Sequence, residues 1–156
     1  DGKATRGIYN ESAGHADYTS SDVNIENVKF TGTAYTFNLY AVAGSGAKLN
    51  VTDCTLQGWT SFTNFASTSF KDCDFTMGTY YNPIPTGEIG WNGCVRPYNQ
   101  TTFENCDFAP GFLLMDGANV TPLYILKNCT IGGVPVTAEN LESLLHQVDR
   151  SRCDIQ

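Results

Sequence analysis

The chain has 156 residues, of which 41% are hydrophobic and 16% charged, and its net charge is −7. This length suits a single domain, residues 1–156, and the hydrophobic content is that of a folded protein. The acidic charge, with no cluster of Lys or Arg, argues against nucleic-acid binding, and no apolar run reaches the roughly 20 residues of a membrane helix. The lack of an initial methionine and of a signal peptide indicates a mature or trimmed chain.

Five segments repeat one six-residue pattern: apolar, polar, Asn or Asp, Cys or Val, polar, apolar. They occupy residues 25–30, 51–56, 70–75, 103–108 and 126–131. Their fourth positions are 28, 54, 73, 106 and 129, so the successive offsets are 26, 19, 33 and 23 residues. Such offsets suit coils made of three short strands with loops between them. The sequence therefore predicts an all-β fold, a single-stranded right-handed parallel β-helix of about five coils over about residues 20–133.

Each position of the pattern has an expected structural role. The Asn or Asp residue is expected at a bend, because these residues tolerate the left-handed conformation and can hydrogen-bond along a stack. The fourth and sixth positions share parity along a strand, so both are expected to face the core. We therefore expect columns of equivalent residues to stack from one coil to the next.

Further strands are expected between the repeated segments. Residues 35–42 alternate, with Phe37 and Leu39 on one face, residues 59–65 alternate less regularly, and residues 112–115 form a short apolar run. The longest interval contains residues 79–98, which include several prolines and are predicted to form a long loop, with a strand near residues 89–95 as a further possibility. A rigid scaffold often presents its functional residues on such loops.

The C-terminal part has a different pattern. Thr137 can cap a helix, and apolar residues follow at helical spacing. These are Leu141, Leu144, Leu145 and Val148. We expect an amphipathic helix over about residues 138–148 that covers the open end of the solenoid, followed by a tail over residues 149–156.

The pattern in residues 70–75 and 103–108 resembles the coils of pectate-lyase-like right-handed parallel β-helix domains. These domains occur in bacterial adhesins, autotransporter passengers, phage tail spikes and secreted polysaccharide-cleaving enzymes. The resemblance covers most of residues 23–133, and residues 93–98 with 101–106 are similar to coils of bacterial surface proteins that have no assigned activity. It implies a secreted or cell-surface location, but the scaffold serves lyases, hydrolases and inert stalks alike.

Four of the six cysteines share the fourth column of the repeat: Cys54, Cys73, Cys106 and Cys129. Val28 fills the same column in the first coil, which indicates that the cysteines act there as small buried hydrophobic residues. A disulfide remains an alternative, most readily between Cys54 and Cys73. The sequence contains no Cys-x-x-Cys pair of the kind that binds zinc. Cys94 and Cys153 lie outside the column.

Two pairs of carboxylates are candidates for chemistry. Asp74 and Asp107 share the fifth column and are expected on neighbouring coils, where such a pair would suit glycoside hydrolysis or calcium binding. Lys29 and Thr55 occupy the same column elsewhere, however, which favours a solvated face. Asp53 and Asp72 stand at the bend position and are expected to be structural. No residue is identified as catalytic, and no metal or other cofactor is expected, with calcium as the one possibility considered.

The long loop supplies the candidate ligand-binding residues Glu88, Trp91, Arg96 and Tyr98. Aromatic faces stack on pyranose rings while charged groups bind hydroxyls, so this set suits sugars. Alternatively, Trp91 and Tyr98 anchor the loop to the scaffold. We expect an extracellular or surface binding and display module, with a glycan or cell-surface polysaccharide as ligand. The alternatives are a polysaccharide lyase or glycosidase, or a structural stalk, and an open solenoid edge would favour self-association.

Overall fold

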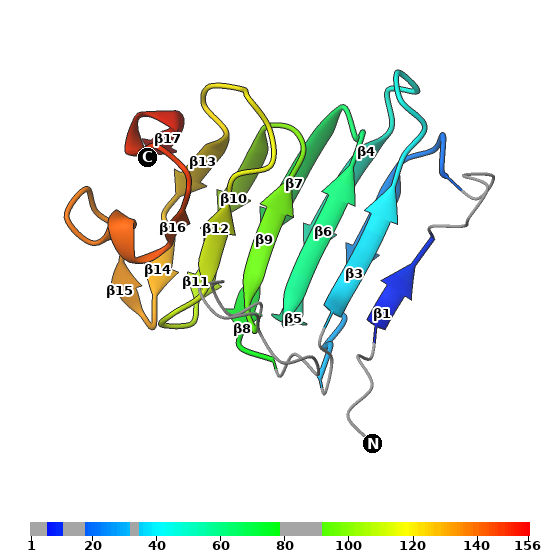
Figure 1. Cartoon of the computed structure of the whole chain (residues 1–156). Coiled ribbons are helices and arrows are strands. Elements are labelled where there is room, and N and C mark those ends of the chain that lie inside the picture. The colour runs from blue at the N-terminus through cyan, green and yellow to red at the C-terminus, as the bar shows by residue number, and fades with distance from the viewer. Residues whose placement is uncertain (1–5, 11–17, 32–34, 79–91) are drawn as a thin grey trace, which may run out of the picture.

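A computed structural model of the chain describes residues 6–10, 18–31, 35–78 and 92–156. The described residues form an all-β protein, as the sequence predicts, and their strands make three sheets (Figure 1). All strand pairs are parallel except that of β14 with β15. No helix among the described residues is long and apolar enough to cross a membrane.

The first sheet lies nearest the viewer in Figure 1 and has the strand order β1-β3-β6-β9-β12-β16. Its strands are β1 (Arg6–Tyr9), β3 (Tyr35–Tyr40), β6 (Trp59–Thr63), β9 (Cys94–Pro97), β12 (Leu113–Met115) and β16 (Leu145–His146). The second sheet has the order β17-β13-β10-β7-β4-β2. Its strands are β2 (Val23–Glu26), β4 (Lys48–Thr52), β7 (Ser67–Lys71), β10 (Thr101–Glu104), β13 (Tyr124–Lys127) and β17 (Cys153–Ile155).

The third sheet has the order β15-β14-β11-β8-β5. Its strands are β5 (Thr55–Gln57), β8 (Asp74–Thr76), β11 (Asp107–Phe108), β14 (Thr130–Ile131) and β15 (Val134–Pro135). From β4 onward the chain visits the second, third and first sheets in turn and then returns to the second. Each circuit adds one strand to each sheet, except that the last adds both β14 and β15 to the third sheet. The arrangement is compatible with a β-helix-like fold.

The bend between the second and third sheets is made by the Asn or Asp residue of the repeat. All five of these residues have positive φ angles between 51° and 56°: Asn27, Asp53, Asp72, Asn105 and Asn128. Asn and Asp are the non-glycine residues that enter this left-handed region most readily. The bend that the repeat predicts is therefore present in every turn.

Two columns of the repeat fill the space between the sheets. The strand register aligns Val51 with Phe70, Phe70 with Phe103, and Phe103 with Leu126. Phe75 and Phe108 align in the same way in the third sheet. All these side chains are buried, and the phenylalanine rings stack from turn to turn, with centroids 5.1 Å apart for Phe70 and Phe103 and 5.0 Å apart for Phe75 and Phe108. The core is thus a continuous apolar column between the three sheets.

The predicted capping helix over residues 138–148 is wrong. The described C-terminal residues contain only short 3₁₀ turns, Leu141–Ser143 and Arg150–Arg152, and Leu145 enters β16. Leu114 N donates to the Leu144 carbonyl at 2.6 Å, so the segment extends the first sheet. Leu141, Leu144 and Val148 are nevertheless buried in the core, as the apolar spacing predicts. The segment covers the apolar core at this end of the molecule and also pairs with the edge of β12. An isolated helix would leave the hydrogen-bonding groups of that edge unpaired.

Two further boundaries differ from the prediction. Residues 149–156 are not a tail, because Cys153–Ile155 pairs with β13 and adds a strand to the second sheet. The predicted loop over residues 79–98 ends earlier than expected, since Cys94–Pro97 forms β9 between β6 and β12. Residues 79–91 lie outside the described part of the chain.

Candidate functional site

Two of the four predicted ligand-binding residues lie in the described part of the chain, and they are in contact. Arg96 is in β9, and its guanidinium carbon lies 5.5 Å from the centroid of the Tyr98 ring. Tyr98 is 41% exposed. This is a cation–π contact with one ring in solvent. Glu88 and Trp91 fall outside the described residues.

The outer side of the first sheet is rich in aromatic side chains. We define the aromatic face by the residues that lie there: Tyr9, Tyr18, Tyr35, Tyr40, Trp59 and Tyr98. Tyr35 stacks on Trp59 with ring centroids 4.7 Å apart, and Tyr18 stacks on Tyr40 at 5.0 Å. Tyr9 and Tyr98 are the most exposed members. Every other aromatic residue in the described ranges belongs to the hydrophobic core.

The other two sheets present polar outer sides. On the second sheet, Asn50 Nδ2 donates to Asn24 Oδ1 at 3.0 Å, and Ser69 Oγ donates to Asn50 Oδ1 at 3.0 Å. On the third sheet the outward positions hold Thr55 and Asp74. The aromatic face is therefore a property of one sheet. Tyr9 and Tyr98 are its exposed members, whereas Tyr35 is buried. Exposed aromatic rings on an acidic protein suit uncharged ligands with apolar ring faces.

Sequence reasoning missed most of the aromatic face. A usable signal was parity: Phe37 and Leu39 face the core, so Tyr40 on the same strand faces outward. Trp59 lies in the next strand of the sheet, opposite Tyr35. The residues of the aromatic face lie together because each turn brings the chain back to the first sheet after some 20 to 35 residues. Which side chains then meet depends on the register of the paired strands.

Asp74 and Asp107 lie side by side on the third sheet, as their shared column predicts. Asp107 is held by its neighbours, because its Oδ1 accepts a hydrogen bond from Gly133 N at 2.9 Å and another from the Thr130 hydroxyl. This carboxylate therefore ties neighbouring turns together. Arg96 belongs to the first sheet, so the third-sheet carboxylates and this guanidinium lie on different sides of the molecule.

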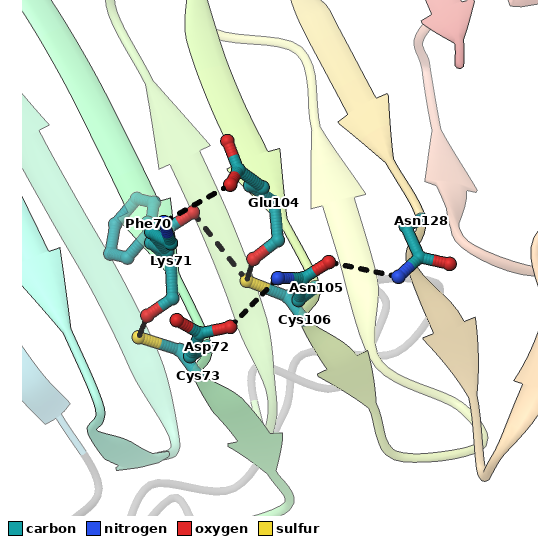
Figure 2. A network of polar contacts seen from close by, with 8 residues as sticks. All are labelled: Phe70, Lys71, Asp72, Cys73, Glu104, Asn105, Cys106 and Asn128. Atoms are coloured by element: carbon teal, nitrogen blue, oxygen red, sulfur yellow. Dashed lines mark hydrogen bonds and ion pairs between the residues drawn. The ribbon is translucent and has the colours of Figure 1, made fainter.

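The bend residues form a hydrogen-bonded ladder (Figure 2). Asn128 Nδ2 donates to Asn105 Oδ1 at 2.8 Å, and Asn105 Nδ2 donates to Asp72 Oδ1 at 2.9 Å. Lys71 and Glu104 form an ion pair beside it, with Nζ and Oε1 3.2 Å apart. Both of these side chains are about half exposed, so the pair contributes little to stability. The ladder assigns Asp72 a structural role, as expected.

The cysteine column is a stack of buried free thiols. Cys54, Cys73, Cys106 and Cys129 occupy successive turns, and all six cysteines of the chain are free. The Sγ atom of Cys106 donates to the Phe70 carbonyl of the preceding turn at 3.6 Å (Figure 2). Cys73 and Cys129 make the same contact, also at 3.6 Å. The alternative of a Cys54–Cys73 disulfide is not realised.

Neighbouring thiols of the cysteine column shift one another's pKa values. Hydrogen bonding with the Cys129 and Cys73 thiols, together with burial, raises the pKa of Cys106. The same hydrogen bonds with Cys106 lower the pKa of Cys73 and of Cys129. Outside the column, burial raises the pKa of Cys94 to about 12. In the described residues, no group of three or more His, Cys, Asp or Glu side chains is arranged to hold a metal ion.

Replacing Cys106 by valine is expected to change the free energy of unfolding by less than about 1.5 kcal/mol. The physical reason is that Val28 already occupies this column in another turn, so the site accepts a branched apolar side chain of similar volume. Urea denaturation of both proteins measures the change. Cys106→Asp is the contrasting variant, since a buried unpaired carboxylate should destabilise the protein by several kcal/mol. A large loss with valine would show that the thiol hydrogen bonds matter more than packing.

No family model, curated protein or solved structure matches the chain. Functional inference therefore rests on the geometry of its own side chains.

Proposed function

We propose that this protein is an extracellular or cell-surface binding and display module whose aromatic face binds glycan chains. The carrying observation is that the two exposed tyrosines of the described residues, Tyr9 and Tyr98, both belong to the first sheet, Tyr9 at the end of β1 and Tyr98 directly after β9. Tyrosine and tryptophan rings offer apolar surface to the C–H faces of sugars, and their polar groups hydrogen-bond to hydroxyls. The scaffold that we propose is a right-handed parallel β-helix of the pectate-lyase-like class.

A binding role accounts for the polar chemistry better than a catalytic one. Glycoside cleavage by an acid–base pair needs two carboxyl groups on either side of one bond. Asp74 and Asp107 adjoin on the third sheet, but Asp107 accepts two hydrogen bonds from its neighbours, and the aromatic face lies on another sheet. The stable repeat then serves to hold the aromatic side chains in fixed positions.

The test is a glycan-array screen of the wild-type protein and of Tyr98→Ala, run with and without calcium. We expect saturable binding of a defined glycan and a loss of about tenfold or more in the variant, as for an exposed aromatic contact residue. Val134→Ala is the matched control, because Val134 is exposed and apolar but lies on the third sheet. If neither calcium condition gives binding, the proposal is wrong and a structural stalk becomes the better description.

A further inference from the structure

The second sheet ends in an open strand edge at β17 (Figure 1). Among the described residues, β17 pairs with β13 on one side and with no strand on the other. Gln156 N donates to the Leu126 carbonyl, so every second residue of β17, counted back from Gln156, faces β13. Cys153 and Ile155 lie between those residues and direct their backbone N–H and C=O groups away from β13. An edge of this kind is a template for a further strand.

The apolar columns are also uncovered at β17. Ile155 aligns with Leu126 and therefore points inward. Leu126 is 1% exposed, whereas Ile155 is 36% exposed. Cys153 aligns with the fully buried Tyr124 and is itself only half-buried. A further turn packed on β17 would bury both side chains, and the burial of apolar surface favours such packing.

The opposite end of the second sheet presents a matching edge. Among the described residues, β2 is the outermost strand there and pairs only with β4. Asn27 N donates to a carbonyl of β4, so Asn24 and Glu26 direct their N–H and C=O groups away from β4. Val23 is half-buried, whereas Leu49, its partner in the register, is fully buried. The apolar columns are thus incompletely covered at both ends.

The two ends form complementary steps, with β1 at one end of the stack and β16 and β17 at the other (Figure 1). In the described part of the chain, the first and second sheets each have six strands. The first sheet begins one strand earlier, at β1, and the second ends one strand later, at β17. A second copy placed on the C-terminal end would therefore set its β1 beside β16 and its β2 beside β17, with all these strands parallel. The third sheet takes no part, because β15 runs antiparallel and ends in Pro135, which has no N–H.

Two outward side chains suit the same arrangement. Asn24 and Asp154 hold the same outward column at its two ends. Asn24 Oδ1 accepts from Asn50 Nδ2, while Asn24 Nδ2 has no partner among the described residues. Asp154 Oδ2 accepts from Gln156 Nε2 at 2.7 Å, which leaves Oδ1 as an acceptor. A donor at one end thus matches a carboxylate at the other, whereas two β17 edges would bring two carboxylates close together.

We propose that the C-terminal end of this protein binds the N-terminal end of a second copy, through pairing of β17 with β2 and of β16 with β1. In the register of the existing columns, Ile155 lies opposite Ile25 of the second copy, and Asp154 lies opposite its Asn24. Such a head-to-tail contact is heterologous, so it repeats from copy to copy and builds a filament, or a ring where the rotation closes. The first sheets of successive copies then adjoin, and the aromatic face is repeated along the assembly.

The test is complementation between two variants, each blocked at one end. Ile155→Lys places a charge in the C-terminal contact, and Asn24→Pro removes an N–H that faces away from β4. In sedimentation velocity we expect concentration-dependent association of the wild type, and association weaker by about tenfold or more for each variant alone. An equimolar mixture of the two variants should form a heterodimer and nothing larger, because each variant keeps one intact end.

Met77→Lys is the matched control. Met77 is 37% exposed, nearly as much as Ile155, but it follows β8 in the middle of the stack, so association should be unchanged. Circular dichroism establishes that each variant is folded before association is compared. A wild-type protein that stays monomeric at every concentration would overturn the proposal, as would a variant mixture that forms no dimer. Association that survives in both single variants, or is lost in Met77→Lys, would show that the copies do not meet at these ends.

Discussion

Replacing Asn105 by alanine is expected to lower the free energy of unfolding by about 2–5 kcal/mol. Asn105 has a φ angle of 52°, and the left-handed region costs an alanine about 1–2 kcal/mol. The variant also loses two side-chain hydrogen bonds of the bend ladder, to Asp72 and from Asn128, each worth about 0.5–1.5 kcal/mol. Urea denaturation monitored by circular dichroism measures the loss.

Asn105→Gly separates the two causes. Glycine enters the left-handed region without steric cost but also lacks the ladder hydrogen bonds. We therefore expect Asn105→Gly to be more stable than Asn105→Ala by about 1 kcal/mol, and less stable than the wild type. Equal stability of the two variants would mean that the backbone conformation at this bend is not under strain.

Replacing Phe103 by alanine is expected to cost about 3–5 kcal/mol, the largest single effect that we predict. Phe103 is fully buried, and its ring stacks on Phe70 at 5.1 Å and meets the edge of Phe108 at 5.2 Å. Removing it leaves a cavity that interrupts the apolar column on both sides. Backbone pairing of β10 with β7 and β13 limits how far the neighbours can move to fill the space.

Val134→Ala serves as the comparison for this prediction. Val134 is 58% exposed at the edge of the third sheet, so its truncation should change the free energy of unfolding by no more than about 0.5 kcal/mol. Both variants are measured by urea denaturation at the same temperature. A loss below about 1.5 kcal/mol at Phe103 would contradict the view that the stacked rings form a tightly packed core.

The repeat predicted the scaffold because each of its positions has a local physical requirement. Asn or Asp marks the left-handed bend, as Asn27 and Asp53 illustrate, and the flanking apolar residues must face inward if the bend is kept. One strand register then satisfies all five segments at once. For this reason the positions of Phe70, Phe103 and Cys106 could be assigned without a structure.

The C-terminal segment could not be predicted in the same way. Leu141, Leu144 and Val148 have helical spacing, and they are buried as expected. Spacing alone does not determine the backbone, however, because the open edge of β12 pairs with Leu145 and His146 of the same segment. Where a short segment can either form an isolated helix or complete an existing sheet, the partner determines the outcome.

The sequence placed the candidate site on the loop over residues 79–98, whereas the structure places the candidate aromatic residues on the outer side of the first sheet. Arg96 and Tyr98 were identified from their residue types and proximity in sequence. Tyr35 and Trp59 carried no shared signal, since they lie 24 residues apart in sequence. They meet because β3 and β6 pair in register, which brings the two ring centroids to 4.7 Å.

The sequence by itself determined the all-β class, the bends and the inward-facing columns, because these follow from local conformational preference and from alternation along a strand. Only the tertiary structure decided which outward residues meet, how the C-terminal end is covered, and that the thiols remain unpaired. The reason is that these features depend on pairing between turns, and the energy of a pairing depends on both partners. Trp59, for example, stacks on Tyr35 only because β6 pairs with β3.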